Sequence, residues 1–595
     1  MRKIYKALII GSGAAAYCAA DSLYREGIKD IAIVTENRLS GTSRNTGSDK
    51  QTYYKISMDG FTPDSPYKMA SDMFSGGSCD GEKMYLEAVY SQRCFLRLCE
   101  YGVQFPTDSY GGYPGYKTDH DDTVRATSVG PLTSKMMTEK LERVVLEKNK
   151  TPLLDNKLVI EILTHNGRAY GIKALDTVTN KTENIFAENI ICATGAPACI
   201  YEDSVYPPSQ HGMTGVMLDA GVRMCNFTQW QYGMASVDFR WNVSGSFMQV
   251  IPRFVSTDEN GKEHEFLSDY FEDINEAYSY VFLKGYQWPF SYARAKESSQ
   301  IDFAIHSETS KGRRVYLDYR KNPDNFCFEK LSDEAKQYIN STQCMADTPF
   351  ERLRKLNSKA IDVYLRQGIN LETDMLRIAV CAQHNNGGVY TDSSFESDIK
   401  SLYVIGEAAG TFGLSRPGGS ALNDTQVSAL VCAKHIAKKS DIISDESIYD
   451  IFTEDETEFT ADESVTYTHL KKKMSQVASF KRDYEGCVSL LEEIKNTLAS
   501  YPKKHSSLYN YYRDKDMLLS MKALLEAIVS ELPLTGSRGG AVFIKDGKII
   551  EENFYYRDYL TVTADATAEY IKVSPVPYGH KPFEYYLSKL DENNM

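Results

Sequence analysis

A glycine-rich turn near the start of the chain is the feature that most constrains the fold. The apolar residues 4–10 run directly into Gly11-Ser12-Gly13-Ala14-Ala15-Ala16, a pattern typical of a buried strand that turns into a helix. Gly11 permits the tight turn, Gly13 leaves room for a pyrophosphate, and Ala16 lets the helix pack close to the strand. The free N–H groups of that helix would point at phosphate. The segment therefore predicts a dinucleotide-binding site.

An acidic residue closes the next predicted strand. Residues 30–35 are followed by Glu36, at about the spacing expected for a carboxylate that accepts both ribose hydroxyls. An acid at this position opposes a 2′-phosphate, so FAD or NAD fits better than NADP. The alternative, a glycine-rich turn in an ordinary parallel sheet, requires no acid here.

The length and charge of the chain exclude some function classes. At 595 residues the chain exceeds a single core and is expected to divide into two to four domains. A hydrophobic content of 42% supports a globular enzyme, whereas a net charge of −14 disfavours nucleic acid as a partner. The short basic run Lys471-Lys472-Lys473 is interpreted as a solvated helix face.

No membrane or metal signal stands out in the sequence. The first apolar segment is short and lacks a following small-residue cleavage site, and no run of about 18 apolar residues occurs. A cytoplasmic location without membrane insertion is therefore predicted. The 12 cysteines are scattered with no CxxC pair, so neither a zinc site nor an iron–sulfur cluster has its usual local spacing, and no metal is predicted.

Strand and helix patterns alternate from the glycine turn to about residue 225. A helix is predicted over 132–147 and a hairpin over 158–175. The strand 190–192 then ends in Ala193-Thr194-Gly195, which would bring backbone beside the nucleotide. Residues 1–225 are predicted to form the first part of the nucleotide domain.

The chain then changes character twice. Residues 226–370 are rich in Trp, Tyr and Phe and predict an inserted α+β capping domain, and the nucleotide pattern returns in 371–440. Residues 441–466 are strongly acidic and predict a linker; 467–595 predict a C-terminal domain with helices over 467–500 and 511–531 and a strand-containing tail. The predicted fold is therefore α/β, with a Rossmann-like domain split by a capping domain and followed by a mainly helical domain.

The order of these motifs resembles that of the flavoprotein subunits of fumarate reductase and succinate dehydrogenase, with the related L-aspartate oxidases and unsaturated-acid reductases. The resemblance spans nearly the whole chain. Besides the motifs above, it rests on His384-Asn385-Asn386-Gly387-Gly388-Val389, Gly406-Glu407, Ser415-Arg416-Pro417-Gly418-Gly419-Ser420-Ala421-Leu422 and, more weakly, Thr535-Gly536-Ser537-Arg538-Gly539-Gly540.

The resemblance implies that the cofactor is FAD. Residues 40–50 contain no histidine that could tether the flavin, and the first histidine of the chain is His120, so non-covalent FAD is expected. The helix that begins near Ser420 would point its N-terminus at the isoalloxazine and stabilise negative charge on reduced flavin. The expected cofactor residues are Gly11, Ser12, Gly13, Ala14, Ala15, Glu36, Ser43, Thr46, Gly47, Ala193, Thr194, Gly195, Gly406, Glu407, Gly419, Ser420, Ala421 and Leu422.

The resemblance also implies catalytic roles for Arg294, His384 and Arg416. Arg294 is similar to a lid arginine that exchanges a proton with the substrate carbon next to the one that exchanges hydride. Such a role requires desolvation and a proton relay; the alternative is that Arg294 only binds carboxylate or stabilises developing charge. His384 and Arg416 are expected to bind a substrate carboxylate.

Two departures from the family pattern bear on the substrate. Gln231 replaces a second carboxylate-binding histidine, and the expected proton-relay step falls at Met248-Gln249, with Arg253 as the one ionisable group at hand. Gln231 and Arg253 are the predicted substrate-binding residues, and a dicarboxylate of fumarate size is not expected. The aromatic lid either stacks on a larger or less charged substrate or forms a packed core.

The predicted function is reduction of an activated C=C bond of an unsaturated carboxylate, with hydride from flavin N5 and a proton from the protein. An amine oxidase or dehydrogenase like L-aspartate oxidase is the first alternative, and an electron-transfer flavoprotein subunit is the second. The chain has no second nucleotide fingerprint, so a separate electron donor is expected: an iron–sulfur protein, a flavin protein or reduced flavin.

Overall fold

The computed structural model describes residues 3–118, 121–439, 446–453, 459–501, 504–579 and 581–592. A five-stranded parallel sheet with the order β20-β11-β2-β3-β7 forms the centre of the nucleotide-binding part. All residues of β2 and β3 are buried, as expected for strands covered on both faces. The strands are β2 (Ala7–Ile10), β3 (Ile31–Val34), β7 (Leu153–Leu154), β11 (Ile190–Cys192) and β20 (Leu402–Val404).

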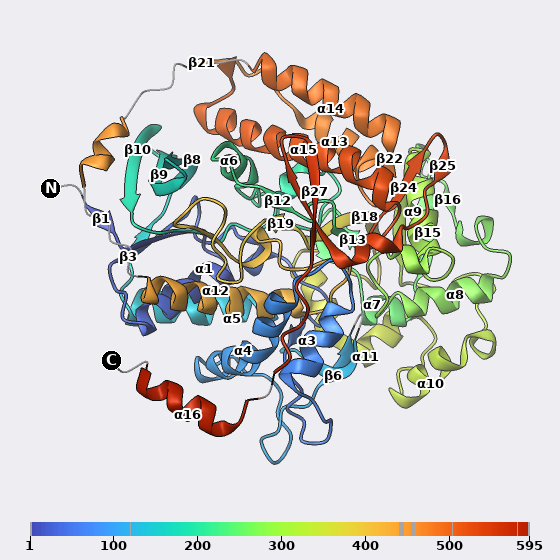
Figure 1. Cartoon of the computed structure of the whole chain (residues 1–595). Helices are drawn as coiled ribbons and strands as arrows, with labels where there is room; N and C mark the ends of the chain where they lie inside the picture. Colours follow the sequence, from blue (N-terminus) through green and yellow to red (C-terminus); the bar gives the residue numbers. More distant parts are fainter. Residues whose placement is uncertain are drawn as a thin grey trace.

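Helices and a second sheet cover the two faces of this central sheet. Helix α1 (Ala14–Arg25) packs against α12 (Ser420–Lys438) and α5 (Thr133–Arg143), and the three lie together below the central sheet in Figure 1. The predicted hairpin forms β8 (Lys157–His165) and β9 (Arg168–Asp176), and the predicted helix 132–147 is α5 continued by a π-helical turn, Val144–Lys148. The other elements here are β1 (Ile4–Tyr5), β10 (Lys181–Ala187), α2 (Thr42–Asn45), α3 (Pro66–Phe74), α4 (Gly81–Glu100), α6 (Thr214–Asp219) and the small sheet of β4 (Tyr53–Tyr54), β5 (Tyr116–Thr118) and β6 (Asp121–Thr127).

The inserted segment builds a cap around a six-stranded sheet with the order β14-β13-β18-β17-β15-β16. Its buried aromatic and aliphatic side chains form an apolar core of their own. Strand β18 pairs with β13 and β17 of the cap and then continues to His384 at the nucleotide site. The elements are β13 (Trp230–Ser236), β14 (Trp241–Asn242), β15 (Arg253–Thr257), β16 (Glu263–His264), β17 (Arg314–Asp318), β18 (Leu376–Asn385), α7 (Ser246–Gln249), α8 (Ile274–Leu283), α9 (Gln300–Ser310), α10 (Asp333–Ser341) and α11 (Pro349–Leu365).

The C-terminal part is mainly helical and lies at the top of Figure 1, with the cap to its right. The single helix predicted over 467–500 is wrong: the structure has α13 (Thr468–Val477), then β22 (Lys481–Asp483), then α14 (Tyr484–Ala499). The chain leaves the helix because β22 pairs with β24 (Val542–Lys545), and Asp483 then caps α14 by accepting from the Gly486 N–H at 2.8 Å. Helix α15 (Leu508–Thr535) is longer than the predicted 511–531.

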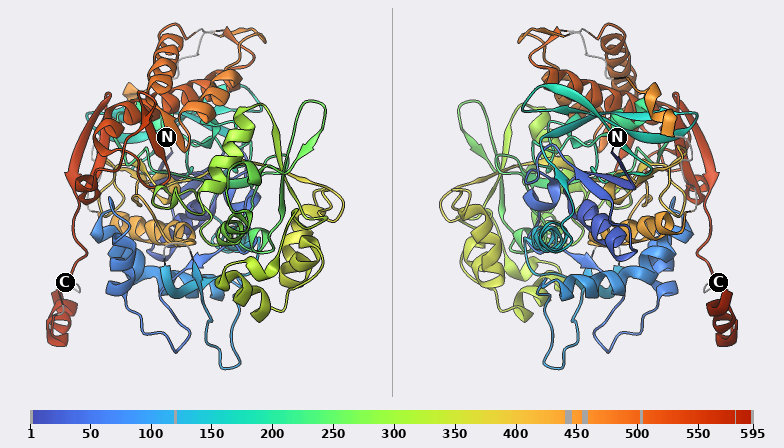
Figure 2. Two further views of the ribbon diagram at one scale, coloured as in Figure 1. Left: turned by 90° about the vertical axis from the view of Figure 1, so that its right-hand side faces the viewer. Right: turned by 90° about the vertical axis from the view of Figure 1, so that its left-hand side faces the viewer.

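The tail returns to the nucleotide-binding part. Strands β26 (Tyr559–Ala564) and β27 (Thr567–Lys572) extend the sheet of β12 (Met224–Cys225) and β19 (Gly388–Val389). The following segment descends past α4, where the Gly81 N–H donates to the Ser574 carbonyl at 2.8 Å, and ends in α16 (Phe583–Glu592) (Figures 1 and 2). The predicted linker 441–466 lies partly outside the described residues, which here include a short helix, Glu446–Ile451.

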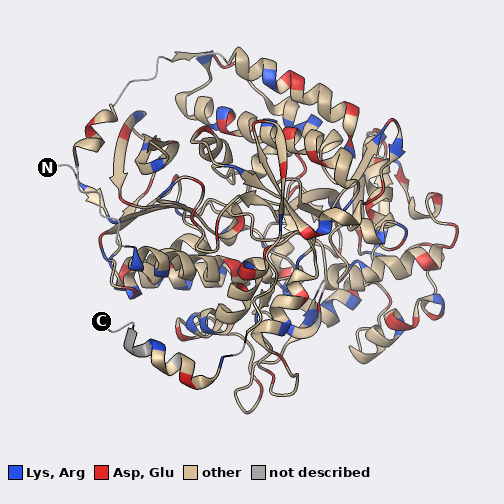
Figure 3. Ribbon diagram, in the orientation of Figure 1, with Lys and Arg blue, Asp and Glu red and all other residues tan. Residues whose placement is uncertain are grey.

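Charged residues of both signs are spread over this framework (Figure 3). Lys and Arg are interspersed with Asp and Glu through all three parts of the chain (Figure 3). Across the ranges that the structure describes, no helix is long and apolar enough to cross a membrane. The α/β fold with a split Rossmann-like domain, a cap and a helical C-terminal part is confirmed.

Candidate active site

A large cavity of about 820 Å³ lies between the nucleotide-binding part and the cap. Its cofactor wall comprises the lining residues of the loops after β2, β3 and β11 and of the first turn of α12. Its cap wall comprises the lining residues contributed by 226–370, which are Gln231, Asn242, Ser244, Gly245, Gln249, Phe282, Gly285, Tyr286, Trp288, Pro289, Glu334 and Tyr338.

The glycine turn forms the floor of the cofactor wall. Gly11 has a φ of +118°, and a Cβ added there would lie 2.5 Å from the Ala193 carbonyl oxygen, so only glycine fits between the two loops. Helix α1 begins directly after its N-cap residue Gly13, which has no side chain to accept from the first N–H groups. The Ala14 N–H donates to Ser43 Oγ at 3.1 Å. This floor fits a pyrophosphate, as the sequence predicts.

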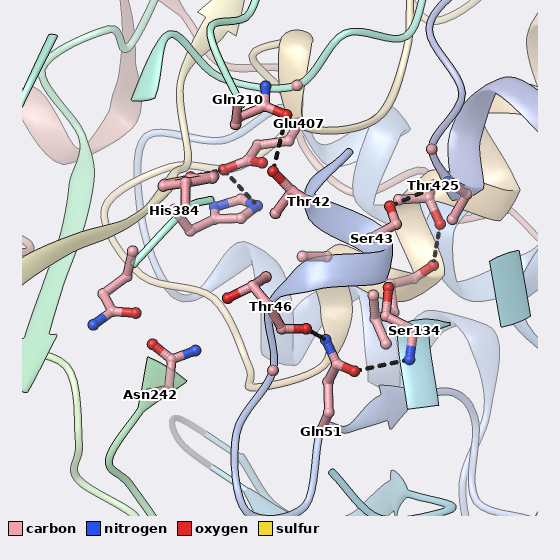
Figure 4. Close-up of a pocket in the computed structure, with 18 of the residues that line it drawn as sticks. Thr42, Ser43, Thr46, Gln51, Ser134, Gln210, Asn242, His384, Glu407 and Thr425 are labelled. Carbon is pink, nitrogen blue, oxygen red and sulfur yellow. Dashed lines mark hydrogen bonds and ion pairs between the residues drawn. The ribbon is translucent and has the colours of Figure 1, made fainter. Parts of the chain in front are cut away.

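The loop after β3 forms the side of the cofactor wall (Figure 4). Thr42 Oγ1 donates to Gln210 Oε1 at 2.9 Å, and Gln51 Nε2 donates to the Thr46 carbonyl at 3.3 Å. The Ser134 N–H in turn donates to Gln51 Oε1 at 2.8 Å. The predicted Ser43 and Thr46 line the cavity, while Thr42, Gln51 and Gln210 are further polar groups that the sequence did not single out.

Glu36 lies at the far end of the cofactor wall, where it meets the C-terminal domain. The Tyr509 hydroxyl and the Arg513 guanidinium, both on α15, contact the Glu36 carboxylate. Arg513 lines the cavity although it is separated from Glu36 by almost the whole chain. No local pattern in the sequence signals this pairing, because it depends on how α15 packs.

The first turn of α12 closes the opposite end of the cofactor wall. Gly419, Ala421 and Leu422 line the cavity, so the helix presents its positive end to the site. The predicted Ser420 and Gly406 are not among the lining residues: the Ser420 hydroxyl donates to the Pro417 carbonyl at 2.7 Å, and Gly406 N–H donates to Ser428 Oγ at 3.0 Å.

Arg416, His384 and Gln231 meet beside the first turn of α12. Arg416 Nη2 donates to Gln231 Oε1 at 2.7 Å, and its Nε donates to Asn386 Oδ1 at 3.2 Å. His384 Nδ1 lies 3.2 Å from the same Asn386 oxygen. Burial, together with the Arg416 charge, lowers the pKa of His384 well below its ordinary value, so its ring is neutral at neutral pH. Arg416 therefore supplies the positive charge of this cluster.

Glu407 lies directly behind His384 (Figure 4). His384 Nε2 is 3.8 Å from Glu407 Oε1, which also accepts hydrogen bonds from the Tyr206 hydroxyl and from the Asn385 N–H. Burial raises the pKa of the Glu407 carboxyl to about 7, even though these hydrogen bonds and Arg416 lower it. A carboxyl that titrates near neutrality thus borders the cavity.

The two other predicted arginines lie outside the lining of the cavity. Arg253 binds acidic side chains of the cap, with Nε to Glu265 at 2.8 Å and Nη1 to Asp318 at 2.9 Å. Arg294 ends a short helical turn, Tyr292–Arg294. Burial and Glu334 raise the pKa of the Tyr286 phenol, and the Arg294 charge opposes them. Arg294 itself is not among the residues that line the cavity, whereas Tyr286 is.

The loop of the late arginine–glycine motif supports this cluster from behind. A Cβ on Gly540 would lie 2.2 Å from the Trp230 carbonyl oxygen, and one on Gly539 would lie 2.9 Å from the Leu414 carbonyl oxygen. Because neither glycine has a side chain, this loop packs directly against the strand that carries Gln231 and the loop that carries Arg416. The resemblance to the family motif identified this segment from sequence, but it did not indicate that the segment lies behind Gln231 and Arg416.

The lining chemistry matches FAD and gives no sign of a metal. A glycine floor suits the pyrophosphate, Glu36 suits the ribose, and the α12 N-terminus suits the flavin ring. The histidines that line the cavity are His211 and His384. Neither lies in residues 40–50, the segment in which a histidine could tether the flavin. Non-covalent attachment stays a prediction. Within the described part of the chain, no three His, Cys, Asp or Glu side chains are grouped to hold a metal ion.

Comparison with known proteins agrees with this assignment. The FAD binding domain family matches residues 6–422. One subunit of the CoM/CoB fumarate reductase of Methanothermobacter marburgensis is 23% identical over 71% of this chain and 70% of its own, and L-aspartate oxidase of Vibrio cholerae is 21% identical over 88% and 91%. A point mutant of E. coli quinol fumarate reductase superposes with a TM-score of 0.70 over 98% of both chains at 16% identity, which shows a shared fold. The chain thus belongs to the FAD binding domain family and is an FAD-dependent oxidoreductase of the succinate dehydrogenase and fumarate reductase flavoprotein group.

Proposed function

We propose that the protein reduces the activated C=C bond of an unsaturated carboxylic acid. The observation that carries this proposal is the position of Arg416, which lies at the start of the flavin-facing helix and beside His384 and Gln231. A planar guanidinium there suits a carboxylate, which would place the conjugated double bond next to the flavin end of the cavity.

Bound FAD would supply hydride transfer at its N5 position. Arg416 holds the carboxylate and withdraws charge from the double bond as hydride adds to the far carbon. In a neutral imidazole one ring nitrogen carries a proton and the other accepts, and either tautomer can form. The neutral His384 can therefore donate a further hydrogen bond to the carboxylate. The α12 N-terminus stabilises negative charge on the reduced flavin.

We propose Arg294 as the source of the proton that adds to the second carbon. Support comes from the family resemblance and from the influence of the Arg294 charge on the pKa of Tyr286, a lining residue of the cap wall. The same arginine could instead act through its charge alone, and the two roles differ in their effect on kcat. A separate electron donor, an iron–sulfur protein, a flavin protein or reduced flavin, would renew the reduced cofactor in the cytoplasm.

Oxidation of an amine is the second candidate. The Glu334 carboxylate on the cap wall suits an ammonium group, and the L-aspartate oxidase similarity covers most of both chains. Both reactions would use the same carboxylate anchor at Arg416. In the reductase, hydride would pass from the flavin to the substrate, and in the oxidase it would pass from the substrate to the flavin.

Anaerobic flavin spectroscopy separates these functions. The purified protein is reduced in the absence of oxygen and mixed with a panel of unsaturated acids, and return of the oxidised flavin absorbance is expected with at least one of them. In parallel, the oxidised protein is mixed with L-amino acids. Bleaching by an amino acid, with no acid reoxidising the reduced protein, would establish the oxidase in place of the reductase.

A further inference from the structure

Two amide oxygens beside the cavity have no hydrogen-bond donor within the described residues. Gln383 is only 8% exposed, and its Nε2 donates to the Gly233 carbonyl at 2.9 Å, which fixes the orientation of the amide. Its Oε1 is buried and unpartnered, and so is Oδ1 of Asn242. Both residues line the cavity, and Asn242 lies on the same side of it as His384 (Figure 4). A buried carbonyl oxygen without a donor destabilises the empty site, so a ligand that donates hydrogen bonds would be favoured here.

The rest of the cap wall is also polar but carries no positive charge. Gln249 accepts from the Tyr338 hydroxyl at 3.0 Å, and Glu334 accepts from the Tyr286 hydroxyl. The Trp288 indole N–H is used by the Met234 carbonyl at 3.1 Å, which leaves its ring to pack against a ligand. None of the described lining residues that 226–370 contribute is Lys, Arg or His.

The basic lining residues lie elsewhere. Besides Arg416 and His384 they are Lys50, Lys117, Lys157, His211 and Arg513, from the nucleotide-binding part and α15. The cap wall therefore offers hydrogen-bond acceptors and an aromatic ring, but no partner for a second carboxylate. An aromatic substituent would fill the space and leave the Gln383 and Asn242 oxygens unpaired.

We propose that the substrate is a hydroxyl-rich monocarboxylate, a sugar-derived acid whose C=C bond is conjugated to its carboxylate. Arg416 binds the carboxylate, while hydroxyl groups donate to Gln383 and Asn242 and the ring stacks on Trp288. The inference rests on the proposed reductase function. Bound reduced FAD would supply hydride to the β-carbon and Arg294 would supply a proton to the α-carbon, so that the saturated hydroxy acid and oxidised flavin would result.

The chemistry also indicates which reaction must come before. A double bond next to the carboxylate of a sugar acid forms when the oxygen substituent on the β-carbon is eliminated together with the α-proton. An eliminating enzyme that acts on uronic acid residues would therefore supply this substrate.

Binding to the oxidised holoprotein tests the substrate class without turnover. D-glucuronate, succinate and hydrocinnamate are titrated while the flavin absorbance is followed. We expect D-glucuronate to bind about tenfold more tightly than either of the others, since one satisfied buried oxygen is worth about 1.4 kcal/mol. Equal or weaker binding of D-glucuronate overturns the proposal.

Variants attribute the preference to the amides. Gln383→Leu, of similar shape, is expected to lose about tenfold in D-glucuronate affinity and to keep its affinity for hydrocinnamate. Gln300→Leu, on α9 outside the cavity, is the matched control and should change neither. If Gln383→Leu fails to retain FAD, Asn242→Ala is measured in the same way. Equal losses for all three acids in the variant that is measured would overturn the assignment.

A turnover experiment keeps this inference separate from the proposed function. The anaerobically reduced protein is mixed with fumarate, cinnamate and the methyl glycoside of a glucuronate whose double bond is conjugated to its carboxylate. Fastest reoxidation by the glucuronide supports both statements. Fastest reoxidation by fumarate or cinnamate overturns the hydroxyl-rich class and leaves the reductase standing. Tight D-glucuronate binding without reoxidation by any of the three overturns the reductase and leaves the binding class standing.

Discussion

The cofactor wall and the cap wall enclose one cavity but are built from different materials. The cofactor wall is built around tight backbone turns and helix N-termini, such as the Gly11 turn and the start of α12, and polar side chains such as Thr42 and Gln51 complete it. The cap wall is made mainly of side chains, among them amides, phenols, a carboxylate and one indole, drawn from five strands or helices and the loops between them. The first suits one fixed type of molecule, a dinucleotide, and the second can change its ligand by changing single side chains.

The largest effect is expected where backbone alone makes the cofactor wall. In Gly11→Val, a Cβ that meets the Ala193 carbonyl oxygen at 2.5 Å, at a φ of +118°, should lower FAD affinity by about a hundredfold or more. FAD content after gel filtration is the measurement. Gly27→Ala is the matched control, because its φ is also positive, at +89°, but its added Cβ meets nothing within 4 Å. Full FAD retention in Gly11→Val would refute the assignment of this turn.

The contrast between the two walls would not hold if a charged side chain of the cap took part in the reaction. If Arg294 donates the proton, Arg294→Ala should retain FAD and lower kcat by about two to four orders of magnitude. Steady-state and single-turnover rates with the best substrate measure this. Lys296→Ala, at an exposed position of the same segment, is the control. Turnover of Arg294→Ala at the wild-type rate would show that Arg294 does not donate the proton. The cap would then contribute only neutral and acidic groups to the site.

Arg416 joins the two walls, and its removal should mainly weaken substrate binding. Arg416→Ala is expected to lower kcat/KM by about 10- to 150-fold, the effect of losing a charged hydrogen bond of about 1.5–3 kcal/mol. Arg416→Lys should recover little of this, because an ammonium cannot form the two parallel hydrogen bonds of a guanidinium. Arg377→Ala removes an exposed pair with Asp238 and should leave kcat/KM nearly unchanged. Equal effects of the two alanine substitutions would contradict the carboxylate role.

The last expected effect concerns the folding stability and its dependence on pH, and it leaves the contrast between the walls untouched. Glu407 has a folded-state pKa of about 7, raised by burial from 4.5, so the folded protein holds a proton that the unfolded chain releases between these values. Stability of the FAD-stripped protein should therefore fall as pH rises from about 4.5 to 7, by on the order of 3 kcal/mol from this group. Glu407→Gln should remove that part of the slope. An unchanged slope in urea unfolding of the variant would show that Glu407 is ionised throughout.

The local turns of the cofactor wall could be predicted from sequence, whereas the amides on the other side of the cavity could not. The Gly11 turn, Glu36, the strand ending at Gly195 and the start of α12 were all predictable, because each is a local pattern that a short stretch of chain specifies. Gln383 and Asn242 were not, since nothing marks an amide in a strand as a ligand until tertiary packing leaves its oxygen without a donor.

Two further differences have packing causes. The helix predicted over 467–500 is interrupted because β22 finds a partner in β24, which lies some sixty residues further on. Arg294 was assigned to the site from its place in the chain, whereas the turn that carries it leaves it outside the lining of the cavity.

The contact of Tyr509 and Arg513 with Glu36 has a consequence for how the holoprotein is made. The two halves of this contact are 473 residues apart, and at a synthesis rate of about 5–20 residues per second they leave the ribosome on the order of a minute apart. The glycine turn thus emerges long before the helix that closes its ribose end. Complete enclosure of FAD must therefore wait until α15 has been translated, although the glycine turn that begins the site is made first.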